Sequence, residues 1–258
     1  MTAAPASWVL LRGLTREARH WGRFPQLLSE ASGGARVVCL DLPGNGKLND
    51  LASLGSVEAM ADFCHAELAS SGIVAPSREL AMSLGAMVAV AWAQRYPQDI
   101  AGAVLINTSL RPFSPFYLRL RAANYLRLLR LFGFKSSDRE LEEAILQMTT
   151  RQVPDPAVVT GQWLQWRHEN PVSRRNTLVQ LLAAARYCAP QMRPVENLLL
   201  LAGARDALVD TRCSLQLAAQ WDARIALHPS AGHDLPLDDG AWVLEQIARW
   251  LESRGAER

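Results

Sequence analysis

Three residue types that together perform nucleophilic catalysis follow one another along this chain, each at the end of an apolar run. Ser83 stands in the segment Ala81-Met82-Ser83-Leu84-Gly85, Asp206 follows the run Leu198 to Ala202, and His233 follows the last such run. A histidine can take the proton of a serine hydroxyl, and a carboxylate can hold that histidine in the required tautomer. The order serine, acid, histidine is the order of one hydrolase architecture. The pattern therefore predicts a catalytic triad of Ser83, Asp206 and His233.

Ser83 lies where an apolar strand is expected to run into an alanine-rich helix. Such a turn projects the hydroxyl outward, and N–H groups at the helix start can receive negative charge that develops on a substrate. Because the backbone comes close to its neighbours there, the motif favours a glycine two positions to either side of the serine. Gly85 meets this requirement, whereas Ala81 replaces the other glycine. We expect the alanine to be tolerated without loss of activity.

The other histidines and a second aspartate have structural explanations. His20 precedes a tryptophan near the first helix, and His65, His168 and His228 belong to a helix, to an inserted segment and to a strand end. Asp210 precedes a threonine at a helix start, where an aspartate commonly caps the helix. Asp206 could also be a turn aspartate, but its place after a strand lets it reach His233.

Short apolar runs alternate with segments that have helical spacing, which predicts an α/β fold. The runs expected to form strands are Val9–Leu11, Val37–Leu40, Glu79–Met82, Val104–Ile106, Leu198–Ala202 and Ile225–Leu227. The segments expected to form helices between them are Phe24–Ser29, Val57–Ser70, Leu84–Tyr96, Thr211–Gln220 and Trp242–Ser253. A mostly parallel, twisted sheet with helices on both faces binds its ligands at the carboxyl ends of the strands.

The alternation stops between residues 110 and 194, where only helical patterns occur. We expect a helical lid there, inserted into a core domain made of residues 1–109 and 195–258. The lid helices are expected at Tyr117–Phe132, Asp138–Thr150, Val158–Arg167 and Thr177–Tyr187. The first of them carries Arg119, Arg121, Arg127 and Arg130. This basic face could simply be exposed to solvent. Alternatively, it could attract anionic substrates or an anionic membrane surface.

Composition excludes several classes of function. The chain has 258 residues, 49% of them hydrophobic, and can bury a core as one domain with an insertion. A formal charge of only +2 gives no general attraction to nucleic acid. Cys39, Cys64, Cys188 and Cys213 lack metal-ligand spacing, so buried free thiols in a reducing compartment are expected. No apolar stretch reaches membrane-spanning length. We expect a cytoplasmic protein with no metal and no cofactor.

Several stretches resemble the α/β-hydrolase superfamily over nearly the whole chain. They are Val9–Leu14 as the first strand and oxyanion loop, Asp41–Gly46 as a glycine-rich turn, the Ser83 elbow with the following Ala86–Ala89, Gly203–Asp206 as the acid loop, and Gly232-His233 with Trp242 and Trp250. The resemblance implies about eight strands with a lid after the sixth. It specifies neither a subfamily nor a substrate.

One departure from the family pattern lies in the oxyanion loop. Family members usually have a histidine before the loop glycine, whereas this chain has Arg12-Gly13. Because the oxyanion is held by backbone N–H groups, the hole can survive, with Leu14 and Leu84 as its donors. Arg12 could bind a substrate carboxylate or satisfy nearby carbonyl groups. Asn107, in a region where some relatives carry an acid, cannot serve as one and is expected to be a turn or pocket residue.

The predicted chemistry is hydrolysis of a carboxylic ester or thioester through an acyl-enzyme. Phe113, Trp163 and Trp166 could line an acyl pocket or form the core of the lid itself. Hydrolysis of a carbon–carbon bond or of a small anionic acid is the alternative within enzymes, in which Arg12 and the lid arginines would matter. A catalytically silent binding module of the same fold is the alternative outside enzymes. The partner expected is a small molecule, and the oligomeric state is left open.

Overall fold

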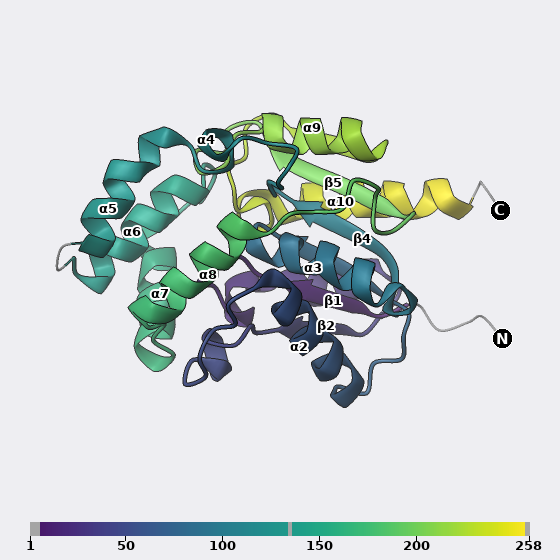
Figure 1. Cartoon of the computed structure of the whole chain (residues 1–258), viewed down its shortest axis with the longest axis horizontal. Helices are drawn as coiled ribbons and strands as arrows, with labels where there is room; N and C mark the ends of the chain where they lie inside the picture. The colour runs from purple at the N-terminus through teal and green to yellow at the C-terminus, as the bar shows by residue number, and fades with distance from the viewer. Residues whose placement is uncertain (1–5, 134–135, 256–258) are drawn as a thin grey trace.

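The computed structural model describes residues 6–133 and 136–255, whose strands form a single parallel sheet (Figure 1). The strand order is β2-β1-β3-β4-β5-β6. The strands are β1 (Trp8–Leu11), β2 (Val37–Leu40), β3 (Ser77–Met82), β4 (Ile100–Ile106), β5 (Leu198–Gly203) and β6 (Arg224–His228). Every apolar run expected to be a strand lies in one of them.

The family-derived expectation of about eight strands is wrong for the part of the chain that the structure describes, which has six. The residues themselves offer six apolar runs, and each of them pairs in the sheet. The remaining segments have helical spacing or turn residues and no apolar run to bury on both faces of a sheet. The helical insertion consequently follows the fourth strand, β4, and not a sixth.

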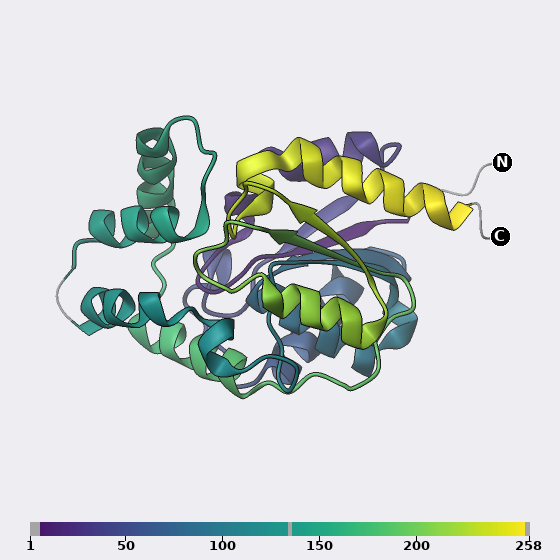
Figure 2. The same cartoon turned by 90° about the horizontal axis from the view of Figure 1, so that it is seen from above.

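Helices cover both faces of the sheet (Figure 2). Those on one face are α2 (Val57–Ser70), α3 (Leu84–Arg95) and α9 (Arg212–Trp221), and those on the other are α1 (Phe24–Ala31) and α10 (Leu235–Gly255). In β1, Val9 and Leu11 face the first layer, whereas Trp8 and Leu10 face the second. The inner strands β1, β3, β4 and β5 are thus largely buried on both sides, which explains their apolar runs, whereas the edge strands β2 and β6 are only partly buried.

The insertion consists of helices that lie together beyond one end of the sheet (Figures 1 and 2). They are α4 (Phe116–Arg119), α5 (Tyr125–Gly133), α6 (Asp138–Thr149), α7 (Pro156–Glu169) and α8 (Arg174–Arg186). Where the chain leaves and re-enters the core, Arg111 and Cys188 form an isolated parallel bridge, and the N–H of Ala189 donates to the carbonyl of Arg111 over 2.7 Å. The two ends of the insertion are therefore held side by side.

The single helix expected at Tyr117–Phe132 is interrupted. Leu120 and Arg121 have extended backbone between α4 and α5, with a short 3-10 turn at Ala122–Asn124. The N–H of Arg121 donates to the carbonyl of Leu208 over 2.9 Å. The N–H of Asp210 donates to the carbonyl of Leu118, also over 2.9 Å. These bonds to the loop after β5 replace the helical ones, so tertiary contacts override the local pattern.

The thiols differ in burial. Cys64 and Cys213 are buried and Cys39 is partly buried, as expected, whereas Cys188 is exposed; all four are free. Within the described ranges, none of the helices combines the length and apolar character needed to span a bilayer.

Candidate active site

Ser83 occupies a strained turn between β3 and α3. Its backbone has φ 55° and ψ −119°, a conformation that residues other than glycine rarely adopt. The turn is held by two bonds. The N–H of Ser83 donates to the carbonyl of Ile106 over 3.0 Å, and the hydroxyl of Thr108 donates to the carbonyl of Ser83 over 3.2 Å. The residues flanking Ser83 are buried, whereas Ser83 itself is partly exposed.

Space around this turn is limited at Gly85 and at Gly13 of the neighbouring loop. A Cβ at Gly85 would lie 2.5 Å from the carbonyl oxygen of Leu11 and 2.6 Å from that of Arg12. A Cβ at Gly13 would lie 3.1 Å from the Cβ of Ser83. The loop after β1 therefore lies directly against the serine. Ala81, by contrast, is accommodated in the core with no exposed surface.

His233 and Asp206 are joined by a short hydrogen bond. The Nδ1 of His233 lies 2.6 Å from the Oδ2 of Asp206, and both side chains are almost fully buried. The other oxygen of Asp206, Oδ1, accepts hydrogen bonds from the N–H groups of Leu208 and Val209, at 2.7 and 2.9 Å. Asp206 thus orients the imidazole with Nδ1 protonated, which leaves Nε2 free to act as a base.

The structure brings Ser83, Asp206 and His233 to the carboxyl ends of β3, β5 and β6, at the same edge of the sheet. Among the described residues, no hydrogen bond joins the Ser83 hydroxyl to His233. Catalytic hydrogen bonds are often long before substrate binds and tighten in the reacting complex. The three side chains therefore come from the same end of the sheet, which is compatible with the predicted triad.

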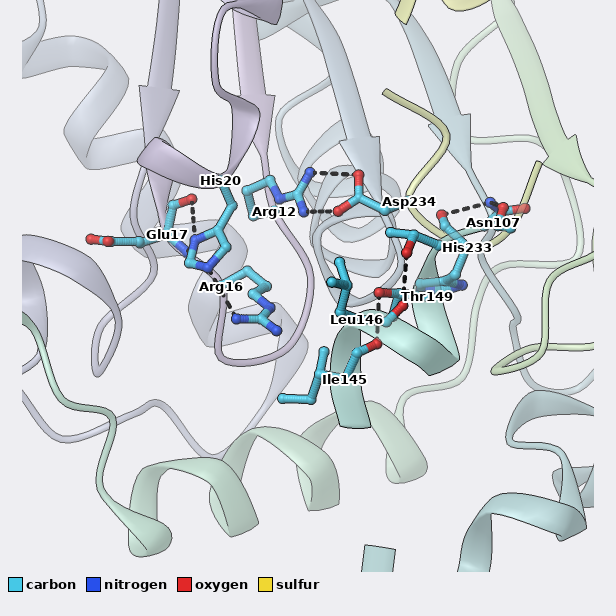
Figure 3. A network of polar contacts seen from close by, with 12 residues as sticks. Arg12, Arg16, Glu17, His20, Asn107, Ile145, Leu146, Thr149, His233 and Asp234 are labelled. Carbon is cyan, nitrogen blue, oxygen red and sulfur yellow. Dashed lines mark hydrogen bonds and ion pairs between the residues drawn. The ribbon is translucent and has the colours of Figure 1, made fainter. Parts of the chain in front are cut away.

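Asn107 bonds to the loop that carries His233. Its amide nitrogen donates to the carbonyls of Gly232 and His233, at 3.0 and 2.7 Å, and its oxygen accepts from the N–H of Gly203 over 2.9 Å. Asn107 has φ 47°, in the left-handed region that asparagine tolerates. It is a turn residue, as expected, whose side chain links β4 to the loop that carries His233 (Figure 3).

The two predicted oxyanion donors, the N–H groups of Leu84 and Leu14, lie at a helix start and in the loop after β1. Leu84 is the first residue of α3, where N–H groups have no acceptor within the helix. Leu14 lies between Gly13 and Thr15, and the N–H of Thr15 donates to the Oε1 of Gln180 over 3.0 Å. Gln180, fully buried on α8, also donates to Asn45 over 2.8 Å. The insertion therefore supports the loop beside Leu14, a role for Gln180 that no local sequence pattern indicates.

Arg12 contacts neither carbonyl groups nor open space. Its terminal nitrogens lie 3.2 and 2.5 Å from the two carboxylate oxygens of Asp234, a bidentate ion pair in which both residues are buried (Figure 3). The guanidinium also lies over the ring of Trp21, 4.8 Å from its centroid. Asp234 was not predicted as a site residue. The one sequence feature that could have indicated a role for Asp234 is its position next to His233.

The three aromatic candidates for an acyl pocket lie in two places. Phe113 packs edge-on against Trp221 of α9, with 5.7 Å between ring centroids. Trp163 and Trp166 of α7 both pack against His20, with 5.5 and 5.1 Å between centroids. Both tryptophans line a cavity with an empty volume of about 280 Å³, including solvent at its mouth. The lining of this cavity includes none of the three triad residues.

A charged cluster beside this cavity connects the insertion to the core. Glu142 of α6 is buried between Arg16 and Arg167, with N···O distances of 2.8 and 2.6 Å. Burial alone would raise the pKa of Glu142, but the two guanidinium groups hold it below its ordinary value. Burial lowers the pKa of His20 well below its ordinary range, and the charges of Arg16 and Arg12 act in the same direction.

The insertion also contacts the loop that carries His233. The N–H of Asp234 donates to the carbonyl of Thr149, at the end of α6, over 2.8 Å. The carboxylate of Asp238 accepts from the N–H groups of Gly232, Arg151 and Gln152, at 2.6 to 3.0 Å. The end of α6 is therefore bonded to Asp234 on one side of His233, and the residues after α6 are linked through Asp238 to Gly232 on the other.

Comparison with protein families gives a match over almost the whole chain. The model of a family described as the alpha/beta hydrolase family matches residues 8–246. No curated protein sequence matches the chain.

Solved structures share the fold at low identity. An esterase from Thermogutta terrifontis is 21% identical with a TM-score of 0.72, over 98% of this chain and 91% of that one. A membrane phospholipase A described as a bacterial virulence factor is 20% identical with a TM-score of 0.76, over 98% and 80%. The 2-hydroxy-6-oxo-6-phenylhexa-2,4-dienoate hydrolase of Rhodococcus sp. strain RHA1 is 17% identical with a TM-score of 0.76, over 96% and 91%.

Proposed function

The chain belongs to the alpha/beta hydrolase family, and from this premise we propose that it is a serine hydrolase that cleaves carboxylic esters or thioesters through an acyl-enzyme. Ser83 is the proposed nucleophile, His233 the base and Asp206 the acid. The observation that carries the proposal is the 2.6 Å bond between His233 and Asp206, at the sheet edge where the strained turn presents Ser83.

The proposed reaction proceeds in two steps. His233 takes the proton of Ser83 as its oxygen attacks the substrate carbonyl, and Asp206 stabilises the imidazolium. The N–H groups of Leu14 and Leu84 hold the oxyanion. His233 then gives the proton to the leaving alcohol or thiol. Water, activated by the same histidine, hydrolyses the acyl-enzyme and regenerates Ser83.

An ester or thioester is favoured over a small anionic acid because the arginines that would bind a carboxylate have other partners. Arg12 binds Asp234. In the insertion, Arg119 donates to the carbonyls of Ala184 and Ala185, and Arg121 pairs with Asp210 over 3.3 Å. The similar solved structures include an esterase, a phospholipase and a carbon–carbon bond hydrolase, so the fold alone does not select one substrate class. We assign the insertion the role of a lid over this site.

A membrane-surface form of the same activity is the second candidate, and α5 favours it. Leu126 and Leu129 are 69% and 66% exposed there, beside Arg127 and Arg130. Leucines flanked by arginines suit an anionic lipid surface. Activation of ester turnover by anionic vesicles, lost in Leu126→Ser/Leu129→Ser, would support this form. If neither anionic nor neutral vesicles change ester turnover, the membrane-surface form is wrong.

A fluorophosphonate probe tests the proposed chemistry directly. Wild type is expected to be labelled on Ser83, identified by peptide mass spectrometry, whereas Ser83→Ala is not labelled and Ser70→Ala, a change at an exposed serine, is labelled normally. A panel of esters and thioesters of graded acyl length then defines the leaving group and the chain length accepted. A folded wild-type protein that takes no label and cleaves none of the panel would be a silent binding module.

A further inference from the structure

The ion pair of Arg12 and Asp234 joins two segments whose relative position matters for the proposed reaction. Arg12 directly precedes Gly13 and Leu14 of the oxyanion loop, and Asp234 directly follows His233. The two residues are 222 positions apart in sequence. In the described part of the chain, their side chains form the only hydrogen-bonded link between the oxyanion loop, residues 12–17, and the histidine loop, residues 229–234.

The geometry of this pair is rigid. Two parallel N–H···O bonds fix both the distance and the relative orientation of a guanidinium and a carboxylate. The ring of Trp21 covers the guanidinium, and Arg12 and Asp234 are 4% and 3% exposed. The N–H of Asp234 is bonded to Thr149 as well. Neither partner can move without disturbing the segment that carries the other.

Arg12 is 4% exposed and already paired with a carboxylate. Both terminal nitrogens are bonded to Asp234, and Nε, which has no partner, is buried from solvent. The positive charge that a substrate carboxylate would seek is thus buried and balanced by Asp234. The contacts therefore favour an action through His233 and the oxyanion loop over direct contact with the substrate.

We propose that Arg12 is a positioning residue, which sets the oxyanion donor of Leu14 relative to His233 through its ion pair with Asp234. This inference rests on the proposed function, because it assigns Arg12 an effect on the same acylation step. Its expected signature is a loss in kcat at nearly constant KM, since transition-state geometry suffers while ground-state binding does not.

The test compares Arg12→Met, Arg12→Lys, Asp234→Asn and the double variant Arg12→Met/Asp234→Asn. Steady-state hydrolysis of p-nitrophenyl acetate, fluorophosphonate labelling rate at Ser83 and thermal unfolding are measured for each. Arg12→Met is expected to lower kcat on the order of 10²-fold, the loss typical of a displacement of about 1 Å. KM should stay within about twofold. Arg12→Lys should recover part of the rate because it keeps the charge.

The double variant should be no slower than the slower single variant, since both single changes remove the same link. The control is Arg95→Met, which breaks a bidentate pair with Asp62, at 2.6 and 3.0 Å, on an exposed part of the surface. Arg95→Met is expected to leave kcat unchanged. Should Arg12→Met fail to fold, Asp234→Asn, which preserves shape, provides the same comparison.

Two results would overturn the inference. A rise in KM with kcat preserved would make Arg12 a substrate-binding residue. A labelling rate and kcat equal to wild type in Arg12→Met and Asp234→Asn, with only the melting temperature lowered, would make the pair structural. Absence of Ser83 labelling in wild type would instead overturn the proposed function and this inference with it.

Discussion

The imidazole of His233 and the carboxylate of Asp206 form a buried pair, with 2.6 Å between Nδ1 and Oδ2. The loop amides of Leu208 and Val209 occupy the other carboxylate oxygen, so Asp206 has one oxygen for the loop and one for the imidazole. Because these bonds come from the loop itself, the carboxylate of Asp206, the proposed acid, is oriented without any substrate. Such preorganisation is what an acid partner of a catalytic histidine requires.

Asp206→Asn should therefore lower ester turnover by about 10³- to 10⁴-fold, because an amide cannot hold the same tautomer of His233. Ser83→Ala and His233→Ala should each abolish turnover to a similar or greater extent. Initial rates with a short p-nitrophenyl ester, together with circular dichroism to verify folding, provide the measurement. Near wild-type turnover in Asp206→Asn would show that another residue is the acid. Asp210→Asn is the matched control at a nearby aspartate.

Asn107→Ala should both destabilise the protein and slow turnover. The change leaves the carbonyls of Gly232 and His233 and the N–H of Gly203 without their partner, at a cost of roughly 1–3 kcal/mol per buried group left unpaired. Urea unfolding measures the loss of stability, and kcat for ester hydrolysis measures the slower turnover.

Asn107→Gly separates backbone strain from hydrogen bonding at this position, since glycine adopts the φ of 47° freely but lacks the amide. It should be as slow as Asn107→Ala if the amide positions His233. Recovery of wild-type kcat in Asn107→Gly would assign the defect to strain alone.

The stability of the fold should depend on pH through His20. Burial lowers the pKa of His20 well below its ordinary value, so the folded protein keeps this imidazole neutral where the unfolded chain binds a proton. The free energy of unfolding should therefore decrease as pH falls below about 6.5, by up to about 1.4 kcal/mol per pH unit from this group. Denaturant unfolding between pH 5 and 7 measures the slope.

His20→Phe keeps aromatic packing against Trp163 and Trp166 and removes the titration, so its slope should be smaller than that of wild type. His168→Gln, at an exposed histidine, should retain the wild-type slope. Equal slopes for wild type and His20→Phe would contradict the assignment.

Gly85→Ala should disrupt the nucleophile turn. The added Cβ would lie 2.5 and 2.6 Å from two backbone oxygens, which cannot move without shifting β1 and the oxyanion loop. Overpacking of this kind typically costs 1–3 kcal/mol, and turnover should fall with it. Ala81→Gly, at the other flanking position, should leave turnover unchanged and cost no more than about 1 kcal/mol. A Gly85→Ala variant with normal melting temperature and turnover would mean that the turn is less crowded than described.

Local chemistry explains why much of the fold was predictable. The inner strands are largely buried on both faces, so each contains a run of apolar residues that can be recognised without any partner. The turn at Ser83 is likewise a local feature, because Gly85 and the alanine-rich helix follow within a few residues. The strand count was mistaken only where it was taken from the family and not from the runs themselves.

Distant contacts explain what was not predictable. The break after α4 depends on two hydrogen bonds with the loop after β5, in which the carbonyl of Leu118 accepts and the N–H of Arg121 donates. Trp163 and Trp166 pack around His20, which is more than 140 residues earlier in the chain. Helical spacing shows that a side chain has an apolar environment but not which segment supplies it.

The sequence by itself determined the α/β class, six apolar runs that form strands, and a serine, an acid and a histidine in order after successive strands. The tertiary structure decided how these residues meet and what holds them. It placed the carboxylate of Asp206 on His233, the amide of Asn107 on the histidine loop, and Arg12 on Asp234. A residue type limits which bonds a side chain can form, whereas the choice among partners depends on the packing of segments far apart in the chain.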